Sequence, residues 1–169
     1  LLTAKPVLYV ANLAESEANG DSDWYRKVEA LAHERKSEAF AIAAKIECEL
    51  AELDPEDAAV FLADLGLEST GLERLIRKAF HLLGLRTYFT AGEKEVRAWT
   101  FHAGDKAPVA AAAIHSDFEK KFIRAQVYSV EDLEQYKSEQ AIKAAGKLRV
   151  EGKDYEMQDG DIVNFLIGN

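Results

Sequence analysis

Short apolar runs alternate with helical patterns in the first half of the chain. Two continuous apolar runs, residues 7–11 and 39–43, are typical of strands buried on both faces. Apolar positions at helical spacing follow each run, beginning with Trp24, Val28 and Leu31. They predict helices over residues 24–36, 46–53, 55–66 and 70–83. The order of strand, helix, strand and further helices indicates an α/β layer with parallel strands.

Polar residues mark the expected starts of these helices. The candidate capping residues are Ser22 or Asp23, Asp54 with Pro55 behind it, and Ser69 or Thr70. Gly84 is a natural C-terminal stop for the last helix. Two strands make a small sheet, so we expect this half of the chain to be part of a larger one.

The pattern changes after Gly84. Alternating β-formers predict a hairpin of strands 85–90 and 95–101, joined by the turn 91–94. Further helices are expected over 109–121 and 130–145, and further strands over 122–128, 148–150, 155–157 and 162–167. A hairpin, a helix and then more strands outline a small α+β sheet that grips one helix, a β-grasp. We therefore expect two domains, residues 1–84 and 85–169.

Composition narrows the class of protein. The chain has 169 residues, 48% of them hydrophobic, which is too apolar for a disordered chain. It has no apolar run of about 18 residues, so we expect no membrane span and no membrane partner. The one cysteine, Cys48, excludes a disulfide scaffold and a multi-cysteine zinc site. The four histidines lack metal-ligand spacing, so we expect no metal site, and a reducing cytoplasm is the simplest location.

The net charge of −9 is shared unevenly. Residues 1–84 hold 9 Lys and Arg against 16 Asp and Glu, and residues 85–169 hold 12 against 14. Either both surfaces are simply solvated, or only the second domain can approach a polyanion such as RNA. If the hairpin and the strand 122–128 are neighbours, six side chains form a basic face. These candidates for RNA or ribosome contact are Arg86, Lys94, Arg97, Lys120, Lys121 and Arg124. No DNA specificity is expected.

A polar string, Asn12-Leu13-Ala14-Glu15, follows the first expected strand. Parallel α/β sheets bind ligands at the carboxyl ends of their strands. The amide of Asn12 can both donate to and accept from a purine edge, and the carboxylate of Glu15 can accept from an exocyclic amine. The alternative is that both residues merely begin a loop.

A second string, Ala43-Ala44-Lys45-Ile46-Glu47, follows the second expected strand. Because the two strands should be neighbours, its backbone N–H groups and Lys45 could line the same base pocket. The alternative is that Lys45 and Glu47 are exposed residues of an early helical turn, where Glu47 favours the helix dipole.

The longer strings resemble a known family. KPVLYVANLAE and AAKIECELAELD are similar to the end of the nucleotide-binding domain of the YchF-type Obg-like ATPases. LGLRTYFTAGEKEVRAWTFHAGDKAPVAAAAIHSDFEKKFIRAQV and GKLRVEGKDYEMQDGDIVNF are similar to that family's TGS domain. The resemblance covers essentially the whole chain. It implies an α/β remnant of a P-loop nucleotide-binding domain followed by an α+β β-grasp (ubiquitin-like) TGS domain.

The resemblance also implies roles for single residues. In this family the guanine-reading Asn-Lys-x-Asp motif is replaced by Asn-x-x-Glu, which corresponds here to Asn12 and Glu15. Leu13 stands in place of the lysine and can offer an apolar face to the purine ring. Ala43-Ala44-Lys45 stands where Ser-Ala-Lys or Cys-Ala-Lys is typical. The loss of the Ser or Cys side chain removes one hydrogen bond, whereas the backbone groups of Ala44 and Lys45 remain.

The parts needed for phosphoryl transfer are missing from the sequence. It contains no G-x-x-x-x-G-K-[ST] loop and no Asp-x-x-Gly switch motif. We therefore expect the C-terminal portion of a longer protein that hydrolyses ATP or GTP with Mg²⁺ and engages the ribosome or RNA. This chain alone should have no catalytic residue, no activity and no tightly bound nucleotide.

Two other classes of function compete with this one. The first is a stand-alone β-grasp interaction module with no nucleotide role. The second is a ubiquitin-like sulfur carrier, which would need a reactive Gly-Gly tail where this sequence has Ile167-Gly168-Asn169.

Overall fold

The computed structural model describes residues 5–92 and 95–168. The chain divides into two compact units between Leu83 and Gly84, and each is described by itself. Among the described residues, no helix is long and apolar enough to cross a membrane.

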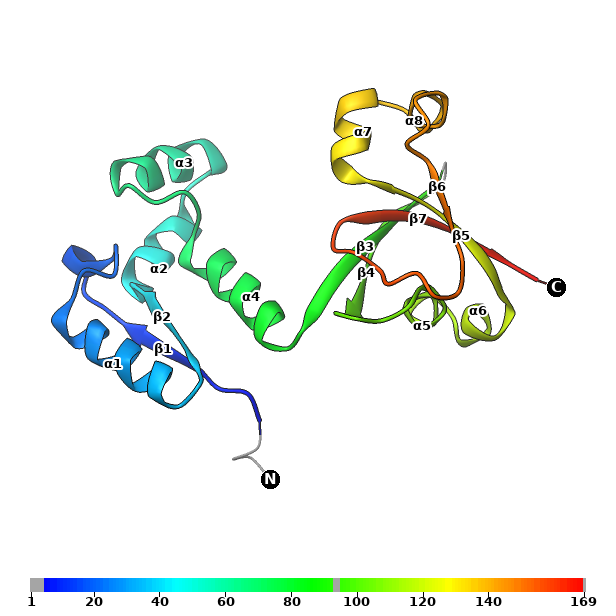
Figure 1. The fold of residues 1–169 in the computed structure, drawn as a ribbon. Helices are drawn as coiled ribbons and strands as arrows, with labels where there is room; N and C mark the ends of the chain where they lie inside the picture. Colours follow the sequence, from blue (N-terminus) through cyan, green and yellow to red (C-terminus); the bar gives the residue numbers. More distant parts are fainter. Residues whose placement is uncertain (1–4, 93–94, 169) are drawn as a thin grey trace. The chain divides into compact units, whose positions relative to one another are not determined.

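The first unit is built on two parallel strands, β1 (Leu8–Asn12) and β2 (Glu38–Ile42), paired from Leu8 with Glu38 to Asn12 with Ile42. Its helical elements are η2 (Glu15–Glu17), α1 (Asp23–Glu34), α2 (Ala44–Glu52), α3 (Pro55–Asp64) and α4 (Gly71–Leu82). The expected strand and helix order is therefore confirmed (Figure 1).

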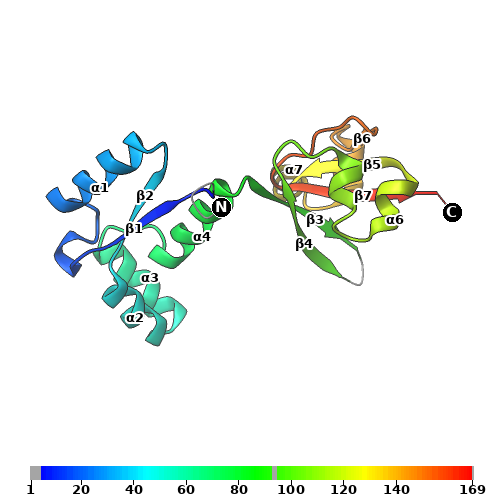
Figure 2. The ribbon, with the colours of Figure 1, turned by 90° about the horizontal axis from the view of Figure 1, so that it is seen from below.

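Helices α1 and α4 lie on opposite faces of the two strands (Figure 2). On one face, Ala41 of β2 lies beside Tyr25 and Gly20. On the other face, the guanidinium of Arg74 on α4 lies 5.4 Å from the centre of the Phe40 ring. Successive residues of a strand point to opposite faces, so Ala39 and Ala41 face α1. Glu38, Phe40 and Ile42 face α4.

The expected capping residues behave differently from one another. The Asp54 carboxylate accepts hydrogen bonds from the backbone N–H groups of Glu56 and Asp57, and the Thr70 hydroxyl accepts one from Glu73. Ser22 occupies the N-cap position of α1, but its hydroxyl makes no capping bond and is buried with no hydrogen-bond partner. The expected cap by Ser22 or Asp23 is therefore wrong for the side chains, although the helix begins where it was expected.

Burial in the first unit also departs from expectation. β1 was expected to be buried on both faces, yet Val10 is 49% exposed and no residue of the strand is fully buried. Within the described residues, β1 pairs only with β2, so its other edge has no neighbouring strand. A two-stranded sheet is too narrow for the helices to bury both of its faces. Trp24 is 74% exposed, so the buried side of α1 is formed by Tyr25 and Ala32 instead.

The second unit is built on a five-stranded mixed sheet in the order β4-β3-β7-β5-β6. Its strands are β3 (Leu85–Ala91), β4 (Val96–His102), β5 (Phe122–Ser129), β6 (Arg149–Glu151) and β7 (Asp161–Ile167). Its helices are α5 (Ala107–Ala111), α6 (Ser116–Lys121), α7 (Val130–Tyr136) and α8 (Glu139–Ala144). β3 and β4 form the expected antiparallel hairpin, whereas β3 and β7 run parallel.

Helices cover both faces of this sheet (Figure 1). The main core lies between the sheet and α5 and α6, and is centred on Tyr88, Val127 and Phe165. A second cluster under α7 and α8 is centred on Tyr128 and Ile142. Within the described residues, the molecule thus has mixed α/β content with one five-stranded sheet.

Three expected elements of the second half are corrected. The helix 109–121 is two helices, because residues 112–115 leave the helix and His115 Nδ1 accepts a hydrogen bond from the N–H of Asp117, which caps α6. The helix 130–145 is broken at Lys137, which has a φ of 62°, and Ser138 then caps α8. The expected strand 155–157 is only an isolated bridge between Lys106 and Glu156.

A buried carboxylate ties the last loop to the sheet. Asp161, only 3% exposed, accepts a hydrogen bond from the Tyr155 hydroxyl at 2.8 Å and from the N–H of Gln158 at 2.9 Å. The guanidinium of Arg149 donates to the other carboxylate oxygen at 3.3 Å. The network therefore joins β6, the loop 152–160 and β7.

Candidate functional site

The two polar strings of the first unit meet at the carboxyl ends of β1 and β2. Asn12 is the last residue of β1, and Ala44 is the first residue of α2. The Asn12 side-chain oxygen accepts a hydrogen bond from the N–H of Ala44 at 3.0 Å. The N–H of Leu13 donates to the carbonyl of Ile42 at 2.8 Å. Parallel pairing therefore brings together residues that are 32 positions apart in the sequence.

Glu15 and Lys45 form an ion pair beside this contact. Lys45 Nζ lies 2.5 Å from Glu15 Oε1 and 3.8 Å from Glu49 Oε1. The hydrogen bond to Glu15, with the negative charges of Glu15 and Glu49, raises the pKa of Lys45 above its ordinary value. The Lys45 and Glu15 side chains are 72% and 47% exposed, so a ligand can reach both of them.

This arrangement presents several hydrogen-bonding groups to a planar ligand. The bond to Ala44 occupies the Asn12 oxygen and so assigns the outward amide role to its NH₂ donor, which suits an acceptor such as a purine ring nitrogen. The second carboxylate oxygen of Glu15 can accept from an exocyclic amine. Leu13, half-buried between them, supplies apolar surface. Asn12, Leu13, Glu15, Ala44 and Lys45 are thus all placed at one end of the two strands.

Glu47 has a role that the sequence analysis missed. It is half-buried, and its two carboxylate oxygens accept from the N–H groups of Gly71 at 2.8 Å and Leu72 at 3.0 Å. Glu47 therefore caps the N-terminus of α4. Its acidic character fits a helix N-terminus, but its partners lie 24 and 25 residues away and carry no local signal.

The basic residues of the second unit do not form one face. The hairpin and β5 are not neighbours, because β7 lies between β3 and β5. Arg97 shares a sheet face with Trp99 and stacks 4.1 Å from the centre of that ring. Arg124 lies on the opposite face of the sheet, together with Tyr128, because the two residues are four positions apart on β5 and alternate residues of a strand share a face.

The remaining basic candidates occupy other places. Arg86 is half-buried on β3, and its guanidinium donates to the carbonyl of Leu85. Lys120 and Lys121 are exposed in the last turn of α6. Lys94 lies outside the described residues. The expectation that the hairpin and β5 are neighbours is therefore wrong. A polyanion that contacts these basic residues would have to bind them at separate places on the surface.

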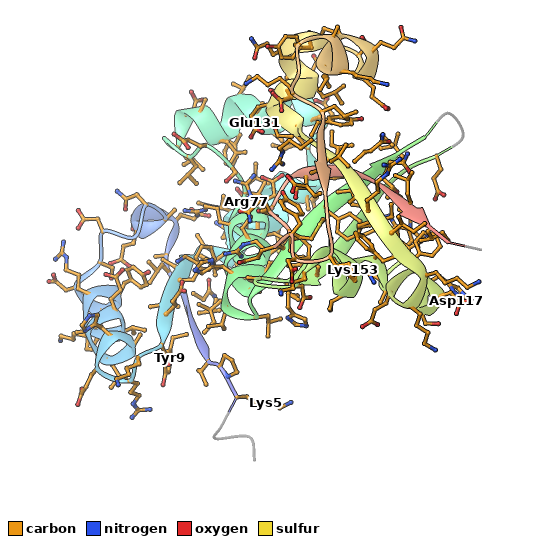
Figure 3. The ribbon with its side chains drawn as sticks, turned by 45° about the vertical axis from the view of Figure 1, so that its right-hand side comes forward. Lys5, Tyr9, Arg77, Asp117, Glu131 and Lys153 are labelled. Carbon is orange, nitrogen blue, oxygen red and sulfur yellow. The ribbon has the colours of Figure 1, made fainter. Side chains whose placement is uncertain are left out.

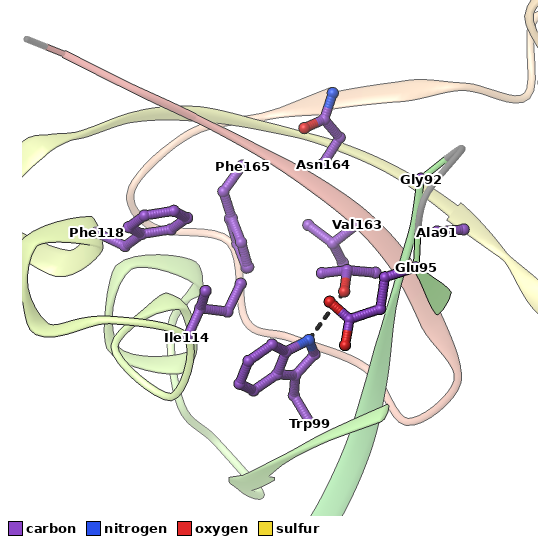
Figure 4. A pocket seen from close by; sticks show the side chains of 10 residues that line it. Ala91, Gly92, Glu95, Trp99, Ile114, Phe118, Val163, Asn164 and Phe165 are labelled. Atoms are coloured by element: carbon purple, nitrogen blue, oxygen red, sulfur yellow. Dashed lines mark hydrogen bonds between the residues drawn. The ribbon is translucent and has the colours of Figure 1, made fainter. Parts of the chain in front are cut away.

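An apolar pocket of about 650 Å³ opens beside the hairpin (Figure 4). The apolar part of its lining includes Trp99, Ile114, Phe118 and Phe165. The indole N–H of Trp99 donates to the Thr90 hydroxyl at 2.9 Å, which fixes the ring in place. The described residues that line the pocket include no cluster of ionisable groups.

Metal ligands are not gathered in the part of the chain that the structure describes. There, no three or more His, Cys, Asp or Glu side chains come together in a way that could hold an ion.

Known proteins resemble this chain in sequence. A family model described as "YchF-GTPase_C: Protein of unknown function (DUF933)" matches residues 85–168. A "Ribosome-binding ATPase YchF" from Bacillus subtilis is 50% identical over 167 residues, which cover 98% of this chain and 46% of that protein. A protein of the same name from Mycoplasma genitalium is 44% identical over 169 residues, with the same coverage. The chain spans about half the length of these curated relatives.

Solved structures resemble it as well. The YchF GTPase of Schizosaccharomyces pombe superimposes with a TM-score of 0.86 and 36% identity, covering 98% of this chain and 44% of that one. A GTP-binding protein from Pyrococcus horikoshii OT3 superimposes with a TM-score of 0.60 over 97% of this chain and 46% of that one. Its 22% identity makes it a likeness of fold alone.

Proposed function

Because this chain belongs to the YchF family, we propose that the intact protein is an ATP- or GTP-hydrolysing factor whose nucleotide base is recognised by the first unit described here. The base would lie against Leu13, between the amide of Asn12 and the carboxylate of Glu15. Ala44 and Lys45 would complete this end of the pocket with a backbone N–H group and an ammonium group.

The hydrogen bond from Ala44 N–H to Asn12 carries this proposal. Two strings with the expected residue types meet at the strand ends, where parallel α/β sheets bind ligands. The bond joins the two strings directly, so that their polar groups face the same edge of the sheet. The relatives named as ATPase and GTPase support a nucleotide as the ligand.

The chemistry of the pair favours adenine over guanine. Adenine offers an exocyclic amine that donates to Glu15, where guanine offers a carbonyl oxygen that would meet a carboxylate. The ion pair with Lys45 holds one carboxylate oxygen of Glu15 at this edge of the sheet, which leaves the other oxygen as an acceptor. When bound in the intact protein, magnesium would neutralise the phosphates; the residues described in this chain would contribute only to binding and orienting the base.

For the second unit we propose a β-grasp TGS domain. Counted along the unit, its strands lie in the order second, first, fifth, third, fourth, with the first and fifth parallel. Helices α5 and α6 lie across the face that carries Tyr88 and Phe165. This arrangement supports the proposal, because a β-grasp is a mixed sheet that packs against a helical segment.

We further propose that the second unit makes the contact with the ribosome or its RNA. The relatives named as ribosome-binding support the partner. The near balance of 12 basic and 14 acidic residues after position 84 supports the choice of unit. A ribosome partner would also place the protein in the cytoplasm.

A specificity swap tests the base site. In the full-length protein, Glu15→Asp combined with Leu13→Lys should move the preference from ATP toward GTP, because a shorter carboxylate can pair with the guanine N1 and N2 donors. A mispaired polar group costs on the order of 1–3 kcal/mol, so the ratio of the two Kd values should change by about tenfold or more. Competition between the nucleotides for a fluorescent ATP analogue measures this ratio.

The matched control is Glu17→Asp, which shortens the neighbouring acid of the same η2 turn. It should leave the ratio unchanged. If the double variant also leaves the ratio unchanged, these residues do not read the base.

A further inference from the structure

The second edge of β2 is open. Within the described residues, β2 is hydrogen-bonded to β1 and to no other strand. Three consecutive residues of β2, Ala39, Phe40 and Ala41, line a groove of about 450 Å³. Consecutive strand residues point to opposite faces, so a groove that touches all three runs along the edge of the strand. We call it the edge groove.

One wall of the edge groove is strongly basic. Arg74, Arg77 and Lys78 follow one another on α4 at spacings that place them on one side of the helix. Arg77 projects from this helix (Figure 3). Among the described residues, only Lys78 of the three has an ion pair, with Glu38 at 3.1 Å. These charges stand out in a half of the chain that carries 16 acidic and 9 basic residues.

Arg74 lines the groove and has no ion pair among the described residues. Its Nε is buried and has no hydrogen-bond partner. Its guanidinium carbon lies 5.4 Å from the centre of the Phe40 ring, so the positive charge stands beside β2.

The opposite wall is different in character. It is formed by Tyr25 and Glu29 of α1, and the loop residues Ala18, Asn19 and Gly20 close one end. Glu29 would repel a carboxylate on its side of the groove. The edge groove therefore prefers a ligand with acidic groups on one side and neutral groups on the other.

An extended peptide meets that requirement, because its side chains alternate between two sides. Its main chain also offers the N–H and C=O groups that an open strand edge can pair with. A nucleic acid backbone has negative charge but no alternating N–H donors. We propose that the edge groove binds an extended acidic segment of a partner protein, which adds to β2 as a further strand and directs its carboxylates to Arg74 and Arg77.

Binding of a short designed peptide to the full 169-residue chain tests this proposal. The probe is a fluorescein-labelled peptide of alternating glutamate and threonine, and its anisotropy reports binding. The same peptide with N-methylated central amides tests main-chain pairing, and a lysine-threonine peptide tests charge. Amide hydrogen exchange of residues 38–42 reports whether the edge of β2 becomes protected.

The matched variants carry the same change in net charge. Arg77→Glu reverses a charge in the edge groove, and Lys27→Glu reverses an exposed charge on α1 that lies against Trp24 instead. We expect Arg77→Glu to weaken binding by about fivefold or more, and Lys27→Glu by less than about twofold. Circular dichroism of both variants checks that they fold. Arg74→Gln, which keeps a side-chain donor while removing the charge, should also weaken binding.

Strand addition would be supported if the glutamate peptide slows amide exchange in β2 and the N-methylated peptide leaves the exchange rate unchanged. Three results would overturn the proposal. They are equal weakening by Arg77→Glu and Lys27→Glu, equal binding of the N-methylated peptide, and a β2 edge already protected in a dimer of the free chain. Complete displacement of the peptide by inorganic phosphate at low millimolar concentration would also overturn it, because it would reduce the groove to an anion site.

Discussion

At the scale of residues, one buried carboxylate, that of Asp161, connects several parts of the second unit. The carboxylate of Asp161 accepts from Tyr155, Gln158 and Arg149, so one side chain connects two strands and a loop. Burial, together with the hydrogen bond to Asp161, raises the pKa of Tyr155 to about 12. The phenol is thus held in its neutral form by the fold.

This network predicts a loss of stability at high pH. The folded pKa of Tyr155 lies above the ordinary value of about 10, so its contribution is fully present below about pH 10 and is lost as the pH rises towards about 12. Tyr155→Phe should cost about 1 kcal/mol at neutral pH and then lose less stability than the parent above about pH 10. Urea denaturation at a series of pH values measures both effects.

Tyr136→Phe is the control, because Tyr136 lies in the same unit outside this network. It should follow the alkaline loss of the parent. Parallel curves for the parent and Tyr155→Phe would contradict the role given to the phenol.

Residue roles were predictable where a local string carries them. The adjacency of Asn12 and Ala44 follows from two strand ends, and Asp54 and Thr70 cap the helices that they precede. Glu47 was not predictable, because its partners in α4 are distant in sequence. The exposure of Trp24 was not predictable either, since helical spacing gives a face but not what covers it.

At the scale of elements, Glu47 connects two helices: it lies on α2 and caps the N-terminus of α4. Gly71 stands where its N–H reaches this carboxylate, and an added Cβ would lie 2.6 Å from Glu47 Oε1 and 2.8 Å from Ile42 Cγ1. The absence of a side chain at Gly71 thus allows α4 to begin directly against β2 and α2. The joint positions the helix that carries the basic wall of the edge groove.

Removal of this cap should weaken the first unit. Glu47→Ala leaves two backbone N–H groups without their acceptor, and one belongs to buried Gly71. We expect a loss of about 1–2 kcal/mol in the free energy of unfolding. Glu49→Ala on the same helix removes an exposed carboxylate and should stay within about 0.5 kcal/mol of the parent. Equal losses in the two variants, measured by thermal or urea unfolding, would rule out the cap.

Element boundaries were predictable where the apolar periodicity ends at a turn or capping residue. The hairpin and β7 are examples. The two long helices expected in the second half were each broken by a capping residue, His115 and Ser138, inside an otherwise helical composition. An N-cap residue in mid-pattern ends one helix as readily as it begins another, and tertiary packing decides between them.

At the scale of the whole molecule, the chain carries the base end of the proposed site without a phosphate-binding loop. We expect this chain alone to show no hydrolysis of ATP or GTP above that of buffer, because no residues cradle the phosphates. Release of inorganic phosphate by a purified sample, with and without Mg²⁺, measures this. Magnesium-dependent turnover that survives repeated purification would refute the expectation.

The proposed ribosome contact predicts a dependence on salt. Residues 85–169 alone should retain most of the binding in co-sedimentation, and residues 1–84 almost none. Lys120→Ala, Lys121→Ala and Arg124→Ala together should reduce the slope of log affinity against log salt by up to about three units. Arg124 lies on a sheet strand and the lysines lie at a helix end, so a partial reduction would show that only some of the three side chains meet phosphate.

The control is a triple variant that removes three other exposed charges of the second unit, at Lys143, Lys147 and Lys153. It should leave the slope nearly unchanged. Pelleting of residues 1–84 with ribosomes, or an unchanged slope in the first triple variant, would place the contact elsewhere.

The position of β7 governs when the second unit can form. Among the described strands of the second unit, β7 is the last to be synthesised, yet it lies in the middle of the sheet, between β3 and β5. The β3–β4 hairpin and the β5–β6 pair therefore cannot join into one sheet until residues 161–167 have left the translating ribosome. Until then, the core around Tyr88 and Val127 is incomplete. Closure pairs Phe89 with Ile162 across more than 70 residues, a long-range step of the kind that slows folding. A nascent chain of this protein thus exposes an incomplete sheet of the second unit until β7 has been synthesised.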